Sequence, residues 1–216
     1  MMRAAIFDMD GVIVDTVPLH FKAWKRMFGE HGIEFGFEDY KEKVDGIPRI
    51  DGARAILKDL PEEGLKKACD NKQVYFLQYL KEDKIPVYES TIDAIRNFLK
   101  KGIKVAAISS SKNCKYILDT IGISKELDAI VDGYDITKGK PDPQVFLLAA
   151  ERVKVEPPEC LVFEDAVLGV EAAKNGGMVC VGIDRYNDPS RLKKADVVVE
   201  DLSKFDYKMV EELFKR

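Results

Sequence analysis

No segment of the 216-residue sequence is apolar for long enough to cross a membrane. Its longest apolar stretches, such as residues 105–108 and 178–183, fall well short of the roughly 20 residues that a transmembrane helix needs. The sequence that follows Met1 also lacks the apolar region and the small-residue cleavage site of a signal peptide. We therefore expect a cytoplasmic protein that has no membrane partner.

The sequence is also poor in cysteine and has no basic segment. Its four cysteines are widely spaced and form no Cys-x-x-Cys pair, which favours reduced, buried thiols. The formal net charge of −4 comes from interspersed acidic and basic residues, so no basic stripe could neutralise a phosphate backbone. Nucleic acid is therefore not an expected partner.

Short apolar runs bounded by turn residues are typical of buried parallel strands. They occur at residues 3–8, 103–109, 129–132, 161–163, 179–182 and 196–199. Helix-length amphipathic stretches, each followed by glycine, lie at residues 91–101, 112–121 and 166–175. This alternation predicts an α/β fold with a doubly wound, mainly parallel sheet.

The connection between the first two strands is far longer than the dozen or so residues that a crossover needs. Residues 19–80 have a helical pattern, interrupted by prolines such as Pro48 and Pro61. The sequence therefore predicts a Rossmann-like core formed by residues 1–15 and 86–216, with a helical cap domain inserted at residues 16–85.

Acidic residues end two of the predicted strands. Asp8 and Asp10 follow the first strand, and Glu164 and Asp165 end a later one. Ligands of such sheets bind at the carboxyl ends of the strands. Four neighbouring carboxylates would repel one another unless a cation offset them, and oxygen ligands of this kind favour Mg²⁺. The alternatives are an acidic turn and an ordinary acidic start of a helix.

Hydroxyl and lysine side chains lie between the two acidic pairs. The sequence Ser-Ser-Ser-Lys-Asn at residues 109–113 leads from a strand into a helix, where it could receive phosphate oxygens. A serine cap beside a solvated lysine is the alternative. Lys140 precedes a proline-rich turn, and a single lysine is by default a surface residue.

In this order, these residues resemble the four ordered motifs of the haloacid dehalogenase superfamily. The resemblance covers the whole chain and includes an insertion in the expected interval. It implies a magnesium-dependent phosphotransferase. The matching residues are Asp8, Asp10, Gly11, Asp15, Thr16, Ser109, Lys140, Pro141, Glu164 and Asp165.

The resemblance implies that Asp8 is the nucleophile and forms an aspartyl-phosphate, which splits a difficult transfer into two easier ones. Asp10 is then the general acid and base. Ser109 and Lys140 would hold the oxygens of the transferring phosphoryl group. The implied Mg²⁺ ligands are Asp8, the Asp10 carbonyl, Asp165 and, through water or as a secondary ligand, Glu164.

Three further segments, residues 15–25, 46–49 and 109–113, resemble those of β-phosphoglucomutases. They imply a phosphomutase that interconverts β-glucose 1-phosphate and glucose 6-phosphate through the aspartyl-phosphate and a bisphosphate intermediate. A small-molecule sugar phosphate is then the expected partner, and a monomer is the expected state. The implied substrate-binding residues are Thr16, His20, Trp24, Arg49, Lys72, Ser110, Ser111, Lys112 and Asn113.

The residues of the insertion also have ordinary structural interpretations. Arg49 is implied to bind the far phosphate in a bidentate manner, but it could equally be a solvated residue that opens a helix. His20 and Trp24 share a helical face and could belong to a core. The match instead implies that His20 couples closure of the cap to the positioning of Asp10. Lys72 could face the sugar or be solvated.

Three positions depart from the pattern of the resemblance. Pro48 and Gly52 stand where hydroxyl residues are usual, and Ala166 stands where serine is common. A missing hydroxyl removes one orienting hydrogen bond worth roughly 1 kcal/mol. These differences therefore concern the identity of the sugar more than the chemistry.

Two other functions remain open at this point. A sugar-phosphate or nucleotide phosphatase would use the same chemistry, with water discharging the phosphorylated aspartate. A receiver-like signalling module also phosphorylates an aspartate on a doubly wound sheet. The helical insertion and the second aspartate, Asp10, argue against the receiver.

Overall fold

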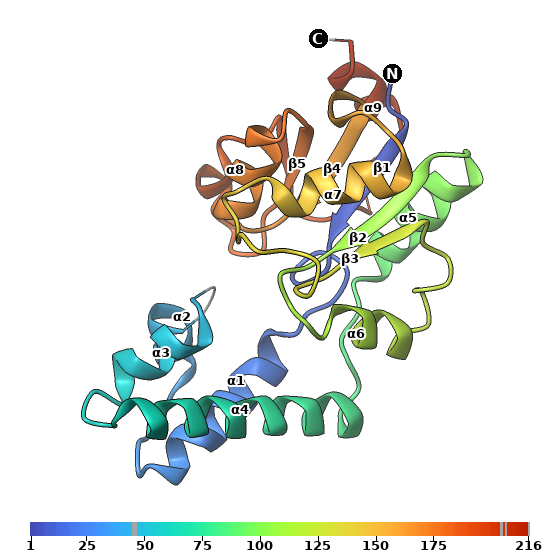
Figure 1. The fold of residues 1–216 in the computed structure, drawn as a ribbon. Helices are drawn as coiled ribbons and strands as arrows, with labels where there is room; N and C mark the ends of the chain where they lie inside the picture. The colour runs from blue at the N-terminus through green and yellow to red at the C-terminus, as the bar shows by residue number, and fades with distance from the viewer. Residues whose placement is uncertain (45–46, 204, 206, 216) are drawn as a thin grey trace. The chain divides into compact units, whose positions relative to one another are not determined.

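The computed structural model describes residues 1–44, 47–203, 205 and 207–215, so Gly46 of the resemblance lies outside the described residues. The chain divides into two compact units (Figure 1). The core unit contains Met1–Asp15 and Pro86–Arg216, and the helical unit contains Thr16–Ile85. The acidic residues at the predicted strand ends therefore all belong to the core unit.

Six strands form one sheet in the core unit, in the order β3-β2-β1-β4-β5-β6. All neighbouring strands are parallel, which confirms the predicted doubly wound α/β fold. The direction of winding reverses at β1, which lies between β2 and β4 (Figure 1). The strands are β1 (Ala4–Asp8), β2 (Lys104–Ile108), β3 (Ala129–Val131), β4 (Cys160–Glu164), β5 (Val179–Ile183) and β6 (Val197–Val199).

Helices cover both faces of this sheet, so its strands are apolar throughout rather than alternating. The helices of the core unit are α5 (Glu89–Lys100), α6 (Cys114–Thr120), α7 (Gln144–Val153), α8 (Val167–Asn175) and α9 (Tyr207–Leu213), with 3₁₀ turns at Pro157–Glu159 and Pro189–Leu192. Along β1, Ala4 and Ile6 pack in a cluster with α7 and α8. Phe7 stacks instead on Phe163 at 4.5 Å between ring centroids and lies 6.2 Å from Phe98 of α5.

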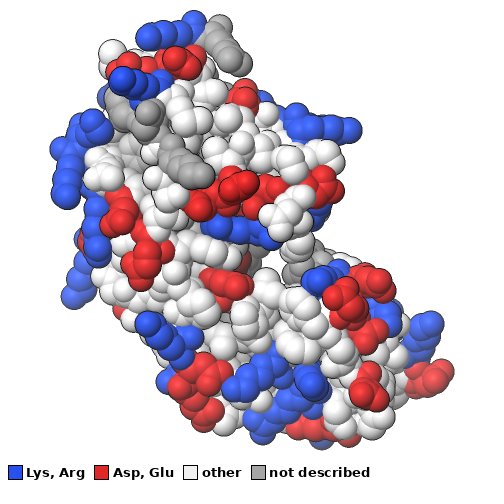
Figure 2. Space-filling model, turned by 180° about the vertical axis from the view of Figure 1, so that it is seen from behind, with Lys and Arg blue, Asp and Glu red and all other residues white. Residues whose placement is uncertain are grey.

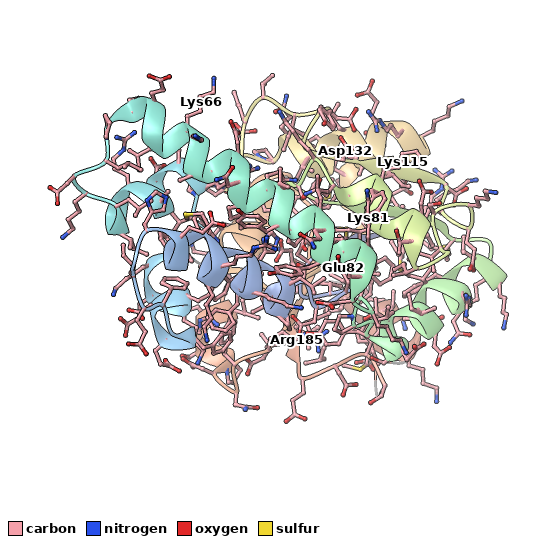
Figure 3. All side chains as sticks on the ribbon, turned by 90° about the horizontal axis from the view of Figure 1, so that it is seen from below. Lys66, Lys81, Glu82, Lys115, Asp132 and Arg185 are labelled. Carbon is pink, nitrogen blue, oxygen red and sulfur yellow. The ribbon has the colours of Figure 1, made fainter. Side chains whose placement is uncertain are left out.

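The described residues of the helical unit form four helices. They are α1 (Val17–Glu30), α2 (Phe37–Lys43), α3 (Arg49–Ile56) and α4 (Glu62–Glu82). α1 and α4 lie side by side, and Trp24 stacks on Phe28 in the core of the unit, with ring centroids 5.2 Å apart. Lys66, Lys81 and Glu82 are exposed on α4 (Figure 3). One face of α4 is thus buried while another carries charge.

Several other expectations can be compared with the structure. Acidic and basic side chains are interspersed over the face shown in Figure 2. All four cysteines are buried and unpaired, as predicted. Within the part of the chain that the structure describes, no helix is both long enough and apolar enough to span a membrane. The helix predicted to begin at Lys112 begins instead at Cys114, because Asn113 N–H donates to the Ser111 hydroxyl in a local turn.

Candidate active site

Three carboxylates converge at the ends of two neighbouring strands. Asp8 ends β1, Glu164 ends β4, and Asp165 follows directly. Each offers one oxygen, and these oxygens lie within 4.8 Å of one another. Asp8 and Glu164 are buried. Because β1 and β4 pair in parallel, their carboxyl ends meet at the switch point of the sheet, where such folds bind ligands.

Lys140 supplies one positive charge to this cluster. Its Nζ donates to Asp8 Oδ1 at 2.7 Å and also forms an ion pair with Glu164. Burial lowers the pKa of Lys140, but the charges of Asp8 and Glu164 outweigh that effect and raise it above the usual value. Lys140 is therefore charged, and its default interpretation as a surface lysine is wrong, because its side chain is only 14% exposed.

A single lysine does not balance the cluster. Burial raises the pKa of Asp8 well above its usual value, Lys140 opposes this, and the neighbouring carboxylates increase it. Burial and the charge of Glu164 raise the pKa of Asp165 to about 8, against the opposing effect of Lys140. A further cation would favour the ionised form of carboxylates whose pKa is raised by burial and by negative neighbours. Their oxygen-only donor set fits Mg²⁺.

Two glycines make room for these carboxylates. Gly169, inside α8, lies against Glu164, and a Cβ at Gly169 would overlap the carboxylate. Gly11 has a φ of +77°, and a Cβ there would overlap the carboxylate of Asp165. Glu164 is fixed further by the backbone N–H of Ala166, which donates to Oε2 at 2.6 Å. The acidic cluster therefore depends on small residues from the turn after β1 and from the start of α8.

Ser109 and Asp10 contact each other beside the cluster. The Ser109 hydroxyl donates to Asp10 Oδ2 at 3.0 Å, and it accepts from the backbone N–H of Ser111 at 2.9 Å. Ser111 in turn accepts from the N–H of Asn113 at 3.1 Å. Residues 109–113 thus form a compact loop that holds the second aspartate in a defined orientation.

The remaining residues of that loop lie at its surface. Ser110 and Lys112 are exposed, and Lys112 Nζ lies 5.1 Å from the ring centroid of Tyr134. Gly133 packs so closely on this loop that a Cβ would overlap the carbonyl oxygen of Ser110. The structure therefore gives residues 109–113 one face toward Asp10 and one face toward solvent.

The helical unit brings together three of the predicted substrate-binding residues. Lys72 Nζ lies 2.7 Å from His20 Nδ1 and 5.1 Å from the ring centroids of Trp24 and Phe76. The imidazole of His20 stacks on Phe76 at 3.9 Å. Lys72 is only 3% exposed, so the alternative that it is a solvated lysine is wrong.

Positive charge surrounds His20 in this cluster. Burial lowers the pKa of His20 well below its usual value, and the charges of Lys72 and Arg49 lower it further. His20 is therefore neutral near pH 7, and its Nδ1 can accept from the Lys72 ammonium. Arg49 donates from Nη1 to the carbonyl oxygen of Cys69 at 3.2 Å. Thr16 is buried beside the start of α1.

Sequence reasoning missed two contributors to the carboxylate site. Gly169 lies within a helical pattern, where glycine lowers helix stability by about 1 kcal/mol relative to alanine. A glycine at such a position indicates that close packing leaves no room for a side chain, and this signal could have identified Gly169. Arg185, after β5, donates from Nε to the carbonyl oxygen of Gly11 at 2.7 Å. No local pattern indicates that contact, because the two residues are far apart in the sequence.

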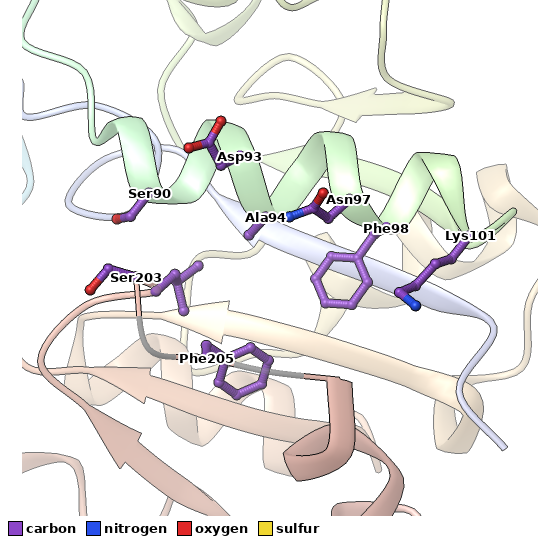
Figure 4. A pocket seen from close by; sticks show the side chains of 9 residues that line it. Ser90, Asp93, Ala94, Asn97, Phe98, Lys101, Ser203 and Phe205 are labelled. Atoms are coloured by element: carbon purple, nitrogen blue, oxygen red, sulfur yellow. The ribbon is translucent and has the colours of Figure 1, made fainter.

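A cavity of about 660 Å³ lies elsewhere in the core unit. It is bounded by α5, including Asp93 and Phe98, and by the segment that contains Ser203 and Phe205 (Figure 4). None of the three clustered carboxylates lines it. The carboxylate cluster at the strand ends is therefore a separate site from this cavity.

Comparisons with known proteins show which family and which relatives the chain resembles. The family model described as haloacid dehalogenase-like hydrolase matches residues 2–177. The chain is 34% identical to the β-phosphoglucomutase of Bacillus subtilis, covering 98% of this chain and 95% of that protein. It is also 34% identical to a phosphorylated carbohydrates phosphatase of Thermotoga maritima, covering 91% and 93%.

Among solved structures, the crystal structure of a β-phosphoglucomutase from Clostridium difficile has a TM-score of 0.85 at 29% identity, and the match covers 100% of this chain and 98% of that one. The family match spans the carboxylate cluster, Ser109 and Lys140 alike. The chain belongs to the haloacid dehalogenase-like hydrolase family.

Proposed function

We propose that the protein is a magnesium-dependent phosphomutase that interconverts β-glucose 1-phosphate and glucose 6-phosphate through an aspartyl-phosphate and a bisphosphate. The observation that carries the proposal is the convergence of Asp8, Glu164 and Asp165 on one point, beside Lys140 and an oriented Asp10. Similarity to β-phosphoglucomutases over nearly the whole chain supports this choice within the family.

In the first half of the proposed reaction, Asp8 is already phosphorylated, and the 6-hydroxyl of β-glucose 1-phosphate attacks its phosphorus. The hydroxyl proton goes to Asp10, the bond from phosphorus to the Asp8 oxygen breaks, and the bisphosphate forms. In the second half, the bisphosphate has turned end for end, and Asp8 attacks the phosphorus at O1. The bond from that phosphorus to the sugar oxygen breaks, and Asp10 returns its proton to the leaving oxygen. Glucose 6-phosphate leaves, and Asp8 is phosphorylated again, as at the start.

The other core residues stabilise charge in this scheme. Lys140 offsets the charge of Asp8 and contacts the transferring phosphoryl oxygens, while Ser109 orients Asp10. Asp8, the Asp10 carbonyl and Asp165 would hold Mg²⁺, with Glu164 acting through water or as a secondary ligand, and the ion would supply positive charge for the phosphoryl oxygens. Ser110, Ser111, Lys112 and Asn113 contribute to binding the rest of the substrate.

We further propose that the helical unit acts as a cap that binds the sugar phosphate. Arg49 is suited to clamp a phosphate through its guanidinium fork, and Lys72 to donate to a sugar hydroxyl. His20 holds the ammonium of Lys72 in place and couples closure of the cap to the positioning of Asp10. Thr16 and Trp24 complete the set, with Trp24 serving mainly to pack against Lys72.

One assay tests the proposal directly. Purified protein is supplied with Mg²⁺, β-glucose 1-phosphate and a trace of glucose 1,6-bisphosphate, and glucose 6-phosphate and inorganic phosphate are followed separately. We expect glucose 6-phosphate to be the dominant product. The exposed Asp93→Asn variant serves as the control and should leave the product ratio unchanged.

A sugar-phosphate phosphatase is the second candidate, because the Thermotoga relative with that kind of activity is as similar as the Bacillus mutase. In that case inorganic phosphate would dominate the same assay, and the mutase assignment would be rejected. A receiver-like module finds no such support, since the matching family model is that of a hydrolase.

A further inference from the structure

Arg185 joins three segments of the core unit that are far apart in the sequence. It follows β5 at the same carboxyl edge of the sheet as the acidic cluster. Its Nε donates to the carbonyl oxygen of Gly11 at 2.7 Å, and its guanidinium lies 3.6 Å from the ring centroid of Tyr88. The geometry therefore places one rigid cation between the turn after β1 and the segment that begins at Pro86.

The Gly11 carbonyl belongs to the turn that presents Asp10. Within this turn the N–H of Gly11 donates to the carbonyl oxygen of Val14 at 2.8 Å. Gly11 also lies directly against the carboxylate of Asp165, with no room for a side chain between them. A displacement of the Gly11 peptide therefore moves the Asp10 carbonyl on one side and disturbs Asp165 on the other.

Tyr88 belongs to the segment through which the chain returns to the core unit. Its N–H donates to the carbonyl oxygen of Ile13 at 3.0 Å, and the N–H of Asp15 donates to the carbonyl oxygen of Pro86 at 3.0 Å. The departing and returning segments are thus already paired. The stacking of Arg185 on Tyr88 attaches these two paired segments to the loop after β5. The same arginine therefore holds both the base of the insertion and the turn at Asp10.

One donor of the guanidinium is unpaired in the described part of the chain, which lowers the stability of the folded protein. Its Nη2 is buried and has no hydrogen-bond partner among the described residues. Leaving a buried donor unpaired lowers stability, so the other contacts of Arg185 must outweigh that loss. A lysine would avoid the buried Nη2, but it would lose the fixed direction of Nε and the planar stack on the tyrosine ring.

We infer that Arg185 is a positioning residue for the divalent cation: it fixes the Asp10 carbonyl through Gly11 and keeps Asp165 in place to complete the ligand set. This inference rests on the proposed function, which assigns the cation to these ligands. Arg185 is not itself a ligand of the cation and does not contact the substrate. It acts by holding the ligands in position.

The test measures Mn²⁺ binding to the substrate-free protein by the electron paramagnetic resonance of free Mn²⁺. Arg185→Met keeps the unbranched apolar stem of the side chain but removes the Nε donor and the planar guanidinium, and we expect Mn²⁺ to bind about 10-fold more weakly. Arg185→Lys should give an intermediate affinity. In kinetics, Arg185→Met should raise the half-saturating Mg²⁺ concentration while leaving the KM for β-glucose 1-phosphate at saturating Mg²⁺ unchanged.

Arg191→Met is the matched control, because Arg191 comes from the same region and also stacks on a tyrosine, Tyr186, at 4.0 Å. Arg191 is exposed, and Arg191→Met should bind Mn²⁺ like the wild type. Equal Mn²⁺ affinity in Arg185→Met and Arg191→Met would overturn the inference, as would full affinity in Arg185→Lys.

Two further results separate this inference from the proposed function. Absence of Mn²⁺ binding in the wild-type protein would reject the proposed cation site, and with it the role of Arg185. If Arg185→Met does not fold, Tyr88→Leu replaces it, since loss of the stack should also weaken Mn²⁺ binding. Wild-type affinity in Tyr88→Leu would then reject the inference.

Discussion

The polar clusters inside the two units of the protein differ in charge. In the core unit, Asp8, Glu164 and Asp165 surround the single ammonium of Lys140, which leaves an excess of negative charge. In the helical unit, the cluster between α1 and α4 is basic: the ammonium of Lys72 contacts His20 and lies among aromatic rings. An acidic cluster suits a cation, and a basic cluster suits an anion. A reaction that combines Mg²⁺ with a phosphorylated sugar needs both.

The two clusters also differ in how they are built. Strand ends place the carboxylates, so the pairing of β1 with β4 determines their spacing. In the helical unit, the contact of α1 with α4 brings His20 to Lys72, with Phe76 packed against both. The core cluster should therefore be sensitive to charge, and the helical cluster should be sensitive to packing. Four predictions test this difference, from the largest expected effect to the smallest.

Removing the proposed nucleophile should have the largest effect. Asp8→Asn keeps the shape of the side chain but removes the negative oxygen that attacks phosphorus in the proposed reaction, so we expect kcat for both transfer and hydrolysis to fall by at least ~10³-fold. The measurement is turnover together with the mass of the phosphorylated protein. A phosphoprotein formed at the normal rate by Asp8→Asn would show that another residue is the nucleophile.

Removing the buried ammonium should chiefly destabilise the core unit. In Lys140→Met, Asp8 and Glu164 lose their partner, and breaking a buried ion pair in this way costs about 3–5 kcal/mol. Urea unfolding measures the loss, and Mg²⁺ should restore part of it. The control is Lys138→Met, since Lys138 is exposed and pairs with Asp142 at the surface, where the effect should stay within about 1 kcal/mol. Equal losses in the two variants would contradict the importance of Lys140.

The stability of the metal-free protein should fall as pH rises. The pKa of Asp165 is raised from 3.8 to about 8 in the folded protein, so the folded state holds a proton that the unfolded state releases. This contribution is fully present below about pH 4 and is lost as pH rises through the folded pKa, with a slope of at most about 1.4 kcal/mol per pH unit. Urea unfolding with a chelator across this range measures the slope.

Asp165→Asn provides the control for the pH experiment, because an amide at this position cannot titrate. Its slope should be shallower than that of the wild-type protein. Mg²⁺ favours the ionised carboxylate, so its stabilising effect on the wild-type protein should grow with pH. Identical slopes in the two proteins would show that Asp165 is already ionised in the metal-free protein.

The sequence predicted the core cluster more completely than the helical one. Asp8 and Glu164 end apolar runs, and parallel strands bring their carboxyl ends to one edge whatever the other side chains are. Their convergence therefore follows from the order of elements. By contrast, Lys72 could be interpreted as solvated because nothing local shows that Trp24 and Phe76 lie over its side chain. That burial depends on how two helices pack, and helical periodicity gives only the face.

Close contacts between residues far apart in the sequence could not be predicted for the same reason. Gly169 is an ordinary helical position until the carboxylate of Glu164 occupies the space of its absent side chain. Arg185 is an ordinary loop arginine until the sheet brings β5 beside β4 and thereby close to the turn after β1. Motifs thus identified the groups that carry charge, whereas the residues that hold those groups in place required the three-dimensional structure.

The smallest effect on stability, and the sharpest test of the helical cluster, comes from Arg49→Ala. Arg49 is exposed and its side chain donates one hydrogen bond to the carbonyl oxygen of Cys69, so the free energy of unfolding should change by less than about 1 kcal/mol. If Arg49 clamps the far phosphate, isomerisation should fall by ~10-fold or more while hydrolysis falls less, because only the mutase must bind both phosphates. The ratio of glucose 6-phosphate to inorganic phosphate measures this. Arg54→Ala, which removes an exposed arginine of the same helix, should leave the ratio unchanged. An equal fall of both activities in Arg49→Ala would mean that the basic cluster binds the substrate as a whole, and the second phosphate would then need another receptor.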